Sequence, residues 1–227
     1  MTKTSVKVRD AASLLIYRRG KQGFEVLMGR RHKNHVFMPH RLVFPGGAAD
    51  PEDMAVTPAT PLHPEIEERL CRGATRVRAR ALAAAAIRET WEETGLMVAA
   101  PLKEPLESAP VSWRDFYDAG VGPDFGALDY FFRAITPPGK VRRFDARFFL
   151  VPAERAHGDI RSNGELIDID WYAIADVKDH AAVHGITSMV LREAEDVLDD
   201  PALLKQRGAR YSRHVRGKRL ITYDGMA

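Results

Sequence analysis

Residues 88–96, RETWEETGL, constrain this chain more than any other segment. Three carboxylates, Glu89, Glu92 and Glu93, stand at positions i, i+3 and i+4, and these positions share one face of an α-helix. A divalent cation such as Mg²⁺ would relieve their mutual repulsion, because hard ions take carboxylate oxygens and bridge to substrate phosphates. The spacing therefore predicts a metal-binding helix face. The alternative is a solvated acidic face on which Arg88 and Glu92 form an ordinary i,i+4 pair.

The sequence around this cluster predicts where the helix lies. Residues 82–87 are rich in alanine and favour a helix. Gly95 is typical of the residue that follows a last helical turn, where a left-handed backbone is common. We therefore expect the acidic cluster in the last turns of a helix that ends before Gly95.

The ordered string of residues 88–96 resembles the second half of the Nudix box, G-x5-E-x7-R-E-U-x-E-E-x-G-U, where U is a bulky apolar residue. Thr90 at a U position is a mild departure. This resemblance to the Nudix hydrolases implies an α/β fold, an α/β/α sandwich with a mixed sheet. It also implies Mg²⁺ or Mn²⁺ as cofactor and a diphosphatase that cleaves phosphoanhydride bonds.

The first half of the box departs from the pattern, because its glutamate would fall on Arg80 and its glycine on Ala74. Further upstream, LVFPGG at 42–47 resembles the strand and Gly-Gly turn that open a Nudix box. We therefore expect a helical insertion within the box over residues 48–79, with a short helix that begins at Pro64.

Two aspartates at the start of this insertion, Asp50 and Asp53, are candidates to replace the missing glutamate by supporting Arg88. The motivation for this hypothesis is that Arg80 stands where the box has a carboxylate.

An interrupted box that begins FPGGxxD is similar to the insert-carrying Nudix hydrolases related to coenzyme A diphosphatases. Residues 26–31, 46–50 and 142–150 resemble segments of the same group. The upstream coenzyme A signature, LLTxRS, is only partly present, because Arg30 and Arg31 correspond to its basic residues and the serine is missing.

The preferred substrate is therefore coenzyme A or an acyl-coenzyme A. ADP-ribose, a dinucleotide or a nucleoside triphosphate stays open as an alternative substrate. A different class also stays open, namely a non-catalytic Nudix module that senses a nucleotide without cleaving it.

The resemblance also suggests which residues form the metal site. The metal ligands are expected to be the side chains of Glu89, Glu92 and Glu93, completed by the backbone carbonyl of Gly46 or Gly47, of which Gly47 is preferred. Arg88 is expected either to orient these carboxylates or to contact phosphate.

Outside the helix, Glu165 is the leading candidate for a general base, which joins Arg88 and Glu92 as the expected catalytic residues. Asp168 and Asp170 alternate with apolar residues, which is typical of the exposed face of a strand. Arg30, Arg31 and Phe37 are the expected substrate-binding residues.

Apolar runs and turn residues predict the remaining elements. Strands are expected at residues 11–17, 24–28, 42–44, 129–135, 146–151 and 167–173. Helical stretches are expected over 175–199 with a break near Gly185, and a terminal hairpin or tail over 211–223. We expect one domain over residues 1–227, in which residues 204–227 form a C-terminal extension.

Composition agrees with an enzyme that has one full core, because 45% of the 227 residues are hydrophobic. Cys71 is the one cysteine, so the sequence excludes an internal disulfide and a multi-cysteine zinc site. We expect a cytoplasmic protein without a membrane-spanning segment. The net charge of +3 is small, and we expect a small nucleotide derivative rather than nucleic acid as partner. A homodimer stays open.

Overall fold

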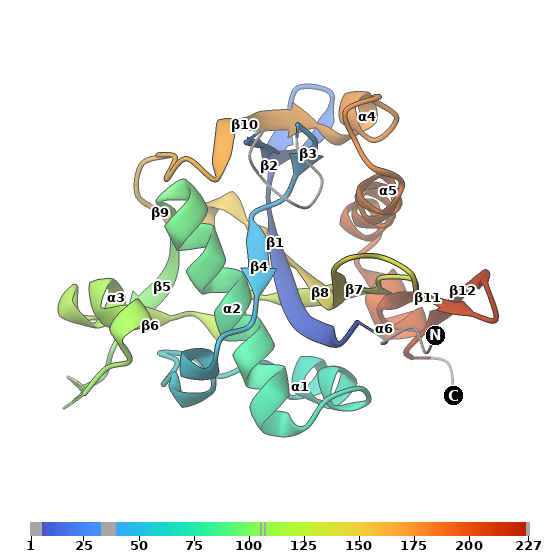
Figure 1. Ribbon diagram of the computed structural model, residues 1–227. Coiled ribbons are helices and arrows are strands. Elements are labelled where there is room, and N and C mark those ends of the chain that lie inside the picture. The colour runs from blue at the N-terminus through green and yellow to red at the C-terminus, as the bar shows by residue number, and fades with distance from the viewer. Residues whose placement is uncertain (1–5, 33–39, 105, 107, 226–227) are drawn as a thin grey trace.

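The computed structural model describes residues 6–32, 40–104, 106 and 108–225. Its centre is a mixed sheet with helices on both faces (Figure 1). The main path of this sheet runs β10 (Leu166–Ala173), β2 (Gly23–Arg31), β1 (Val8–Gly20), β8 (Arg143–Pro152), β7 (Asp129–Ile135), β11 (Arg210–Val215) and β12 (Lys218–Tyr223). Two short strands lie beside this path, β3 (Leu42–Val43) against β2 and β4 (Gly46–Ala48) against β1.

A second, smaller sheet and the helices complete the fold. The small sheet has the order β6 (Val121–Pro123), β5 (Met97–Pro101) and β9 (Ala156–His157). The α-helices are α1 (Pro64–Cys71), α2 (Arg76–Thr94), α3 (Arg114–Asp118), α4 (Ile174–Val177), α5 (Gly185–Asp199) and α6 (Ala202–Arg207). The 3-10 turns of the described residues are η1 (Pro51–Ala55), η2 (Val111–Trp113), η3 (Phe125–Ala127) and η4 (Ala153–Arg155).

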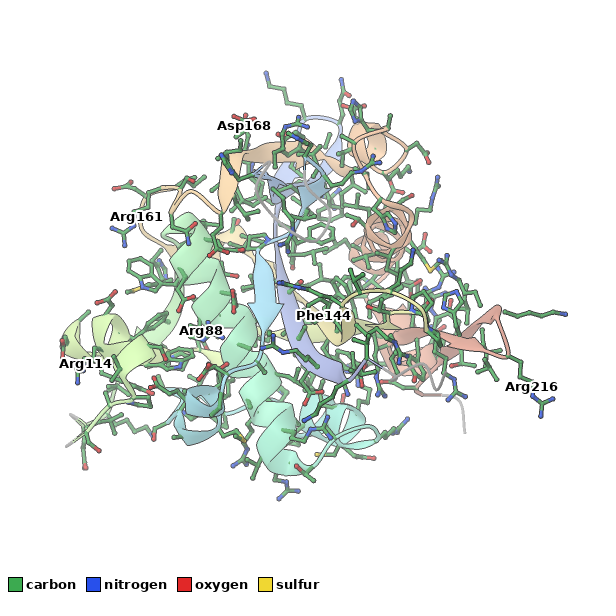
Figure 2. All side chains as sticks on the ribbon, in the orientation of Figure 1. Arg88, Arg114, Phe144, Arg161, Asp168 and Arg216 are labelled. Carbon is green, nitrogen blue, oxygen red and sulfur yellow. The ribbon has the colours of Figure 1, made fainter. Side chains whose placement is uncertain are left out.

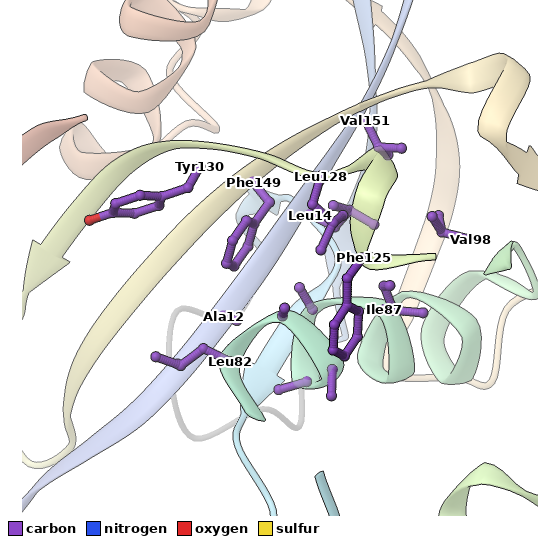
Figure 3. Packing of buried hydrophobic residues seen from close by; sticks show 14 of the residues in the cluster. Ala12, Leu14, Leu82, Ile87, Val98, Phe125, Leu128, Tyr130, Phe149 and Val151 are labelled. Carbon is purple, nitrogen blue, oxygen red and sulfur yellow. The ribbon is translucent and has the colours of Figure 1, made fainter. Parts of the chain in front are cut away.

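The alternation of side chains along β1 divides the core into two layers. Successive residues of a strand point to opposite faces of the sheet. Leu14 and Ile16 therefore join the cluster that contains the buried residues of α2, whereas Leu15 joins the cluster that contains those of α5. Figure 3 shows part of the first cluster, in which Leu14 of β1, Ile87 of α2 and Phe125 lie in the layer between the sheet and α2. This is the predicted three-layer α/β/α arrangement.

The first strand of the chain lies inside the sheet rather than at its edge. β1 pairs with β2 through an antiparallel hairpin and with β8 in parallel, in a register that runs from Val8↔Arg143 to Tyr17↔Pro152. β4 also pairs with β1, at Ala12↔Gly47 and Ser13↔Gly46. The backbone around the two glycines is therefore fixed by the central strand.

The predicted strands are all present, and residues 211–223 form a hairpin of β11 and β12. One local prediction was wrong, because the two glycines form strand β4 rather than a turn. Gly46 has φ 148°, and a Cβ there would lie 2.4 Å from the carbonyl oxygen of Ala12. Only glycine permits this close pairing with β1.

The predicted helices are also present. The helix expected at Pro64 is α1, and α4 and α5 are separated by a break just before Gly185. The segment 48–79 contains η1, α1 and the first residues of α2. Over the residues that the structure describes, we find no helix with the length and apolar character that crossing a bilayer demands.

Candidate active site

Helix α2 has well-formed ends, which place its acidic residues. The Thr75 hydroxyl caps its start by accepting a hydrogen bond from the amide of Arg78, at 3.3 Å. Gly95 ends it in the left-handed conformation, with φ 74°, as predicted. The last turns carry Glu89, Glu92 and Glu93, as expected from the sequence.

Arg88 is the centre of the candidate site, and its side chain is only 6% exposed. Figure 2 labels it on α2. Its Nη1 lies 3.0 Å from Oε1 of Glu89 and 3.1 Å from Oε2 of Glu92. Its Nε and Nη2 lie 2.9 and 3.1 Å from the two carboxylate oxygens of Asp53, and Nη2 is also 3.1 Å from the Ala48 carbonyl.

These contacts use the whole hydrogen-bonding capacity of Arg88. A guanidinium group has five N–H donors. The contacts with Asp53, Glu89, Glu92 and the Ala48 carbonyl provide five acceptor oxygens. In this arrangement Arg88 orients carboxylates and has no N–H left for a phosphate, which favours the first of its two predicted roles.

The two glycines of β4 lie directly against the acidic residues of α2. The amide of Gly46 donates a hydrogen bond of 2.8 Å to Oε2 of Glu93. At Gly47, a Cβ would lie 2.4 Å from the carboxyl carbon of Glu89. Glycine is therefore needed at position 47, because any larger residue would displace this carboxylate.

Burial changes the acidity of two of these glutamates. Burial raises the pKa of Glu89 to about 7, although the neighbouring Arg88 charge opposes the rise. Burial also raises the pKa of Glu93 to about 8, against the hydrogen bond from the Gly46 amide, which lowers it. Burial would lower the pKa of Arg88, but the hydrogen bonds with Asp53 and the nearby carboxylates raise it above its ordinary value.

Asp53 occupies the supporting position that was predicted for an aspartate of the insertion. It is fully buried in η1, and its Oδ1 also lies 3.3 Å from the indole nitrogen of Trp113. Its Oδ2 accepts a hydrogen bond of 2.8 Å from the Asp50 amide. The hydrogen-bond partners of Arg88 given above do not include Asp50. Its side chain instead caps η1 by accepting a hydrogen bond of 2.9 Å from the Glu52 amide.

The residue at the place of the box glutamate lies elsewhere. Arg80 is exposed on the opposite end of α2, where it binds Glu67 of α1 at 2.6 Å. Position 80 therefore faces α1 rather than Arg88. In this protein Asp53 makes the ion pair with Arg88 from outside the helix.

The residues around Glu93 fit a divalent cation. Within the described ranges, no three His, Cys, Asp or Glu side chains are already gathered at metal-binding distance. Glu89 and Glu92 instead bind Arg88, and Glu93 binds the Gly46 amide. Nevertheless, the available donors are hard carboxylate oxygens, the type that Mg²⁺ and Mn²⁺ prefer. The missing Cβ of Gly47 also leaves the Glu89 carboxylate close to the backbone of β4.

The charges of two predicted residues outside α2 act on Glu93. The charge of Glu165 raises the pKa of Glu93, and the charge of Arg31 lowers it, as smaller effects beside that of burial. Glu165 precedes β10, and its carbonyl accepts a hydrogen bond from the His32 amide at 3.1 Å. The ends of β2 and β10 therefore bring Arg31 and Glu165 towards α2.

Arg30 lies in a different environment from Arg31. Its Nε is 3.4 Å from Oδ2 of Asp168, and its Nη1 is 3.2 Å from the His40 carbonyl. It also lines a cavity of about 330 Å³ together with Trp171 and Tyr172. Its predicted role in substrate binding stays a prediction, as does that of Phe37, which lies outside the described residues.

Asp168 and Asp170 are exposed, as predicted, but their backbone is not that of a regular strand. The pairing of β10 with β2 shifts between Ile167 and Asp170, and Asp168 has φ 52°. This is a bulge, a feature that re-aims side chains at the edge of a site. Period-two alternation could not reveal it.

The sequence reasoning missed the residues that hold this site together from behind. Trp113 binds Asp53, and the neighbouring Ser112 binds Glu52 through its amide at 2.9 Å and its hydroxyl at 2.7 Å. No local feature of the sequence signals this support: a tryptophan indole N–H rarely stays unbonded in a core, but the partner that it finds is visible only in the structure.

Comparison with known proteins places this geometry in a family. A family model described as NUDIX domain matches residues 7–191. A search of curated protein sequences found no match.

Solved structures with a similar fold agree with the family match. A NUDIX hydrolase from Alicyclobacillus acidocaldarius is 26% identical, with a TM-score of 0.68, and the match covers 88% of this chain and 96% of that one. A MutT protein from Methanosarcina mazei Go1 is 16% identical, with a TM-score of 0.50, over 86% and 97% of the two chains. The second likeness concerns the fold alone.

Proposed function

Because this chain belongs to the NUDIX domain family, we propose that it is a divalent-metal-dependent hydrolase of a diphosphate linkage in a nucleoside diphosphate derivative. One observation carries the proposal: the guanidinium of Arg88 orients Glu89 and Glu92 beside Glu93, where the glycine backbone of β4 closes on them. A sensor that only binds a nucleotide would not need these carboxylates to be held so closely.

In this proposal Mg²⁺ or Mn²⁺ is held by Glu89, Glu92 and Glu93, with the backbone carbonyl of Gly47 as a further ligand. The ion, when bound, neutralises phosphate charge and lowers the pKa of a bound water. The raised pKa values of Glu89 and Glu93 support a cation here, because two buried carboxylates are poorly stabilised without one.

The side chains then have distinct tasks. Arg88 orients the carboxylates, and Asp53 holds Arg88. Glu165 is proposed as the general base, which accepts a proton from the attacking water. Its position at the start of β10, close enough for its charge to act on Glu93, supports this role.

For the substrate, we propose coenzyme A or an acyl-coenzyme A, cleaved to a phosphopantetheine product and adenosine 3′,5′-bisphosphate. The resemblance of residues 26–31, 46–50 and 142–150 to coenzyme A diphosphatases supports this choice. Arg31, whose charge acts on Glu93, offers complementary charge to the substrate phosphates. ADP-ribose, a dinucleotide and a nucleoside triphosphate are the alternatives.

The test is a panel of these diphosphates incubated with Mg²⁺ or Mn²⁺, with the products identified in ¹⁸O-labelled water. Glu92→Gln and Glu93→Gln should each reduce turnover by about 100-fold or more, because loss of a charged ligand weakens metal binding. Glu68→Gln is the matched control, since Glu68 is an exposed helical glutamate of α1 that pairs only loosely with Arg72. Tight nucleotide binding without metal-dependent hydrolysis would instead favour the sensor.

We also propose a cytoplasmic location, which the single cysteine, Cys71, supports. The oligomeric state is open to a direct measurement by light scattering, in which a homodimer would give twice the mass of the 25.4 kDa chain.

A further inference from the structure

The segment from Gly158 to Glu165, which connects β9 to β10, lies on the C-terminal end of α2. A Cβ on Gly95 would lie 2.8 Å from the Asp159 carbonyl and 2.4 Å from Cγ of Arg161. A Cβ on Gly158 would lie 2.8 Å from the Gly95 carbonyl. The segment and the helix end are therefore in direct backbone contact.

Arg161 makes two further contacts with the helix. Its amide donates a hydrogen bond of 2.8 Å to the carbonyl of Thr94, one of the last carbonyls of α2. Its guanidinium lies over the ring of Trp91, with 4.4 Å between Cζ and the ring centroid. Figure 2 shows Arg161 beside the upper end of α2. Stacking of this kind is favourable both electrostatically and through dispersion.

Trp91 is itself held in place from its other side. Its indole nitrogen lies 3.2 Å from Oδ2 of Asp115, and its ring meets that of Phe116 edge-to-face at 6.2 Å. Because Phe116 is buried in the core, the indole is a fixed surface for Arg161. Trp91 directly precedes the two glutamates at 92 and 93, so a contact on its ring is a contact with the catalytic helix.

Beyond Arg161, a compact turn continues to Glu165. The Ser162 hydroxyl bonds to the carbonyl of Leu166 and accepts from the Gly164 amide, the latter at 2.9 Å. The Asn163 side chain accepts from the Glu165 amide at 2.9 Å. The far end is tied to β2, because the His32 amide donates to the Glu165 carbonyl. A displacement at Arg161 would therefore be transmitted to Glu165 through a turn that these hydrogen bonds hold together.

We propose that Arg161 is a positioning residue, which holds the segment that carries Glu165 against the end of α2 by stacking on Trp91. The inference rests on the proposed function, because it assigns a task to the general base of that reaction. Arg161 acts through the segment that it anchors and is not itself a group that touches the reacting atoms.

The first test is a kinetic double-mutant cycle on the substrate identified above. Arg161→Ala should reduce kcat by about 10-fold, since small displacements of a reacting group have large effects on rate, while KM changes less than about 2-fold. In a Glu165→Gln background the same substitution should reduce kcat by less than about 2-fold. Arg161→Lys, which keeps the charge but not the planar group, should recover only part of the loss.

The second test is amide hydrogen exchange, which does not depend on turnover. Arg161→Ala and Trp91→Leu should each increase exchange at residues 162–165 by about 10-fold or more, because the segment opens more often. Arg219→Ala, an exposed arginine of β12 on the terminal hairpin, is the matched control and should change neither exchange nor kcat.

The outcomes separate the two proposals. If the wild-type protein is active but Arg161→Ala leaves either kcat or the exchange at residues 162–165 unchanged, the positioning role is overturned and the proposed hydrolase function stands. If the kcat losses from Arg161→Ala and Glu165→Gln multiply in the double variant, the positioning role is overturned as well. A wild-type protein without metal-dependent turnover would overturn the proposed function, and with it any catalytic task for Arg161.

Discussion

Asp53 and Arg88, 35 positions apart in the sequence, form a two-point ion pair in which both side chains are buried. The pair joins η1, which lies in the segment predicted as an insertion, to the helix that carries the acidic cluster. The segment that was predicted as an insertion thereby contributes to the candidate site. Its first turn contributes the carboxylate that α2 itself lacks at Arg80.

Asp53→Asn should therefore reduce both activity and stability. It would leave the buried guanidinium of Arg88 without its main counter-charge, which typically lowers the free energy of unfolding by about 3 kcal/mol or more. We expect kcat to fall by about 10-fold, because Glu89 and Glu92 lose their fixed partner. Urea unfolding and steady-state kinetics measure the two effects.

Asp50→Asn is the matched control for this substitution, because Asp50 lies in the same turn and an asparagine can still cap η1. It should change kcat and the free energy of unfolding little. Equal effects of the two substitutions would show that η1 matters only as a folded unit and that Asp53 has no special task.

Gly47→Ala should weaken metal binding. The added methyl group would stand 2.4 Å from the Glu89 carboxyl group, so this side chain must move away from its place beside Arg88. We expect the dissociation constant for Mn²⁺, measured by calorimetry, to rise about 10-fold. Gly185→Ala is the control, because a Cβ there meets no atom within 4 Å. An unchanged Mn²⁺ affinity in Gly47→Ala would exclude Glu89 as a ligand held by this contact.

The metal-free protein should lose stability as the pH rises. Glu89 and Glu93 have folded-state pKa values of about 7 and about 8, above the ordinary 4.5, so the folded protein binds their protons more tightly than the unfolded chain. This contribution is fully present below about pH 4.5 and is lost as the pH passes through 7 to 8. Melting temperatures in EDTA between pH 5 and 8.5 measure it.

Two comparisons isolate the contribution of these glutamates. Mg²⁺ should reduce the loss at high pH, because it binds the ionised carboxylates. Glu93→Gln should flatten the pH dependence in EDTA, since it removes one of the two titrating groups. If the slope in EDTA were the same with and without Glu93, other groups would be responsible for it.

Glu193 offers a stability test away from the site. Its side chain is fully buried in α5 and binds Arg207 at 2.8 Å and Arg210 at 3.0 Å, which ties the C-terminal segment to α5. Glu193→Ala should lower the free energy of unfolding by about 3 kcal/mol or more, because both arginines lose their acceptor. Below the unfolding temperature, kcat should stay unchanged.

Glu195 on the same helix is the matched control. It pairs with Lys178, and both side chains are more than 20% exposed. Glu195→Ala should lower the free energy of unfolding by about 1 kcal/mol or less. A similar loss from both substitutions would contradict the proposed anchoring by Glu193.

The sequence predicted those parts of the site that depend on local spacing. Glu89, Glu92 and Glu93 share a helix face because of the helical repeat. Gly95 ends that helix because glycine readily adopts the left-handed backbone of a helix end. The contact of Asp53 with Arg88 was also predictable, because Arg80 stands where the box has a carboxylate and an aspartate of the next upstream segment can replace it.

Other features depend on contacts between segments that are distant in the sequence. The pairing of Gly46 and Gly47 with β1, the support of Asp53 by Trp113 and the bulge at Asp168 have no local signal. The stacking of Arg161 on Trp91 is of the same kind, since an arginine in a polar loop looks solvated until the fold places an indole beneath it. Tertiary packing determines each of these features.

The parallel pairing of β1 with β8 also has a consequence for biosynthesis. β1 emerges from the ribosome well before β8, the strand that covers one of its edges and follows only at residues 143–152. Until then a nascent chain presents a hydrophobic strand with unpaired backbone groups, a template for unwanted association. Yield in a heterologous host should therefore respond to slower translation or to added chaperones.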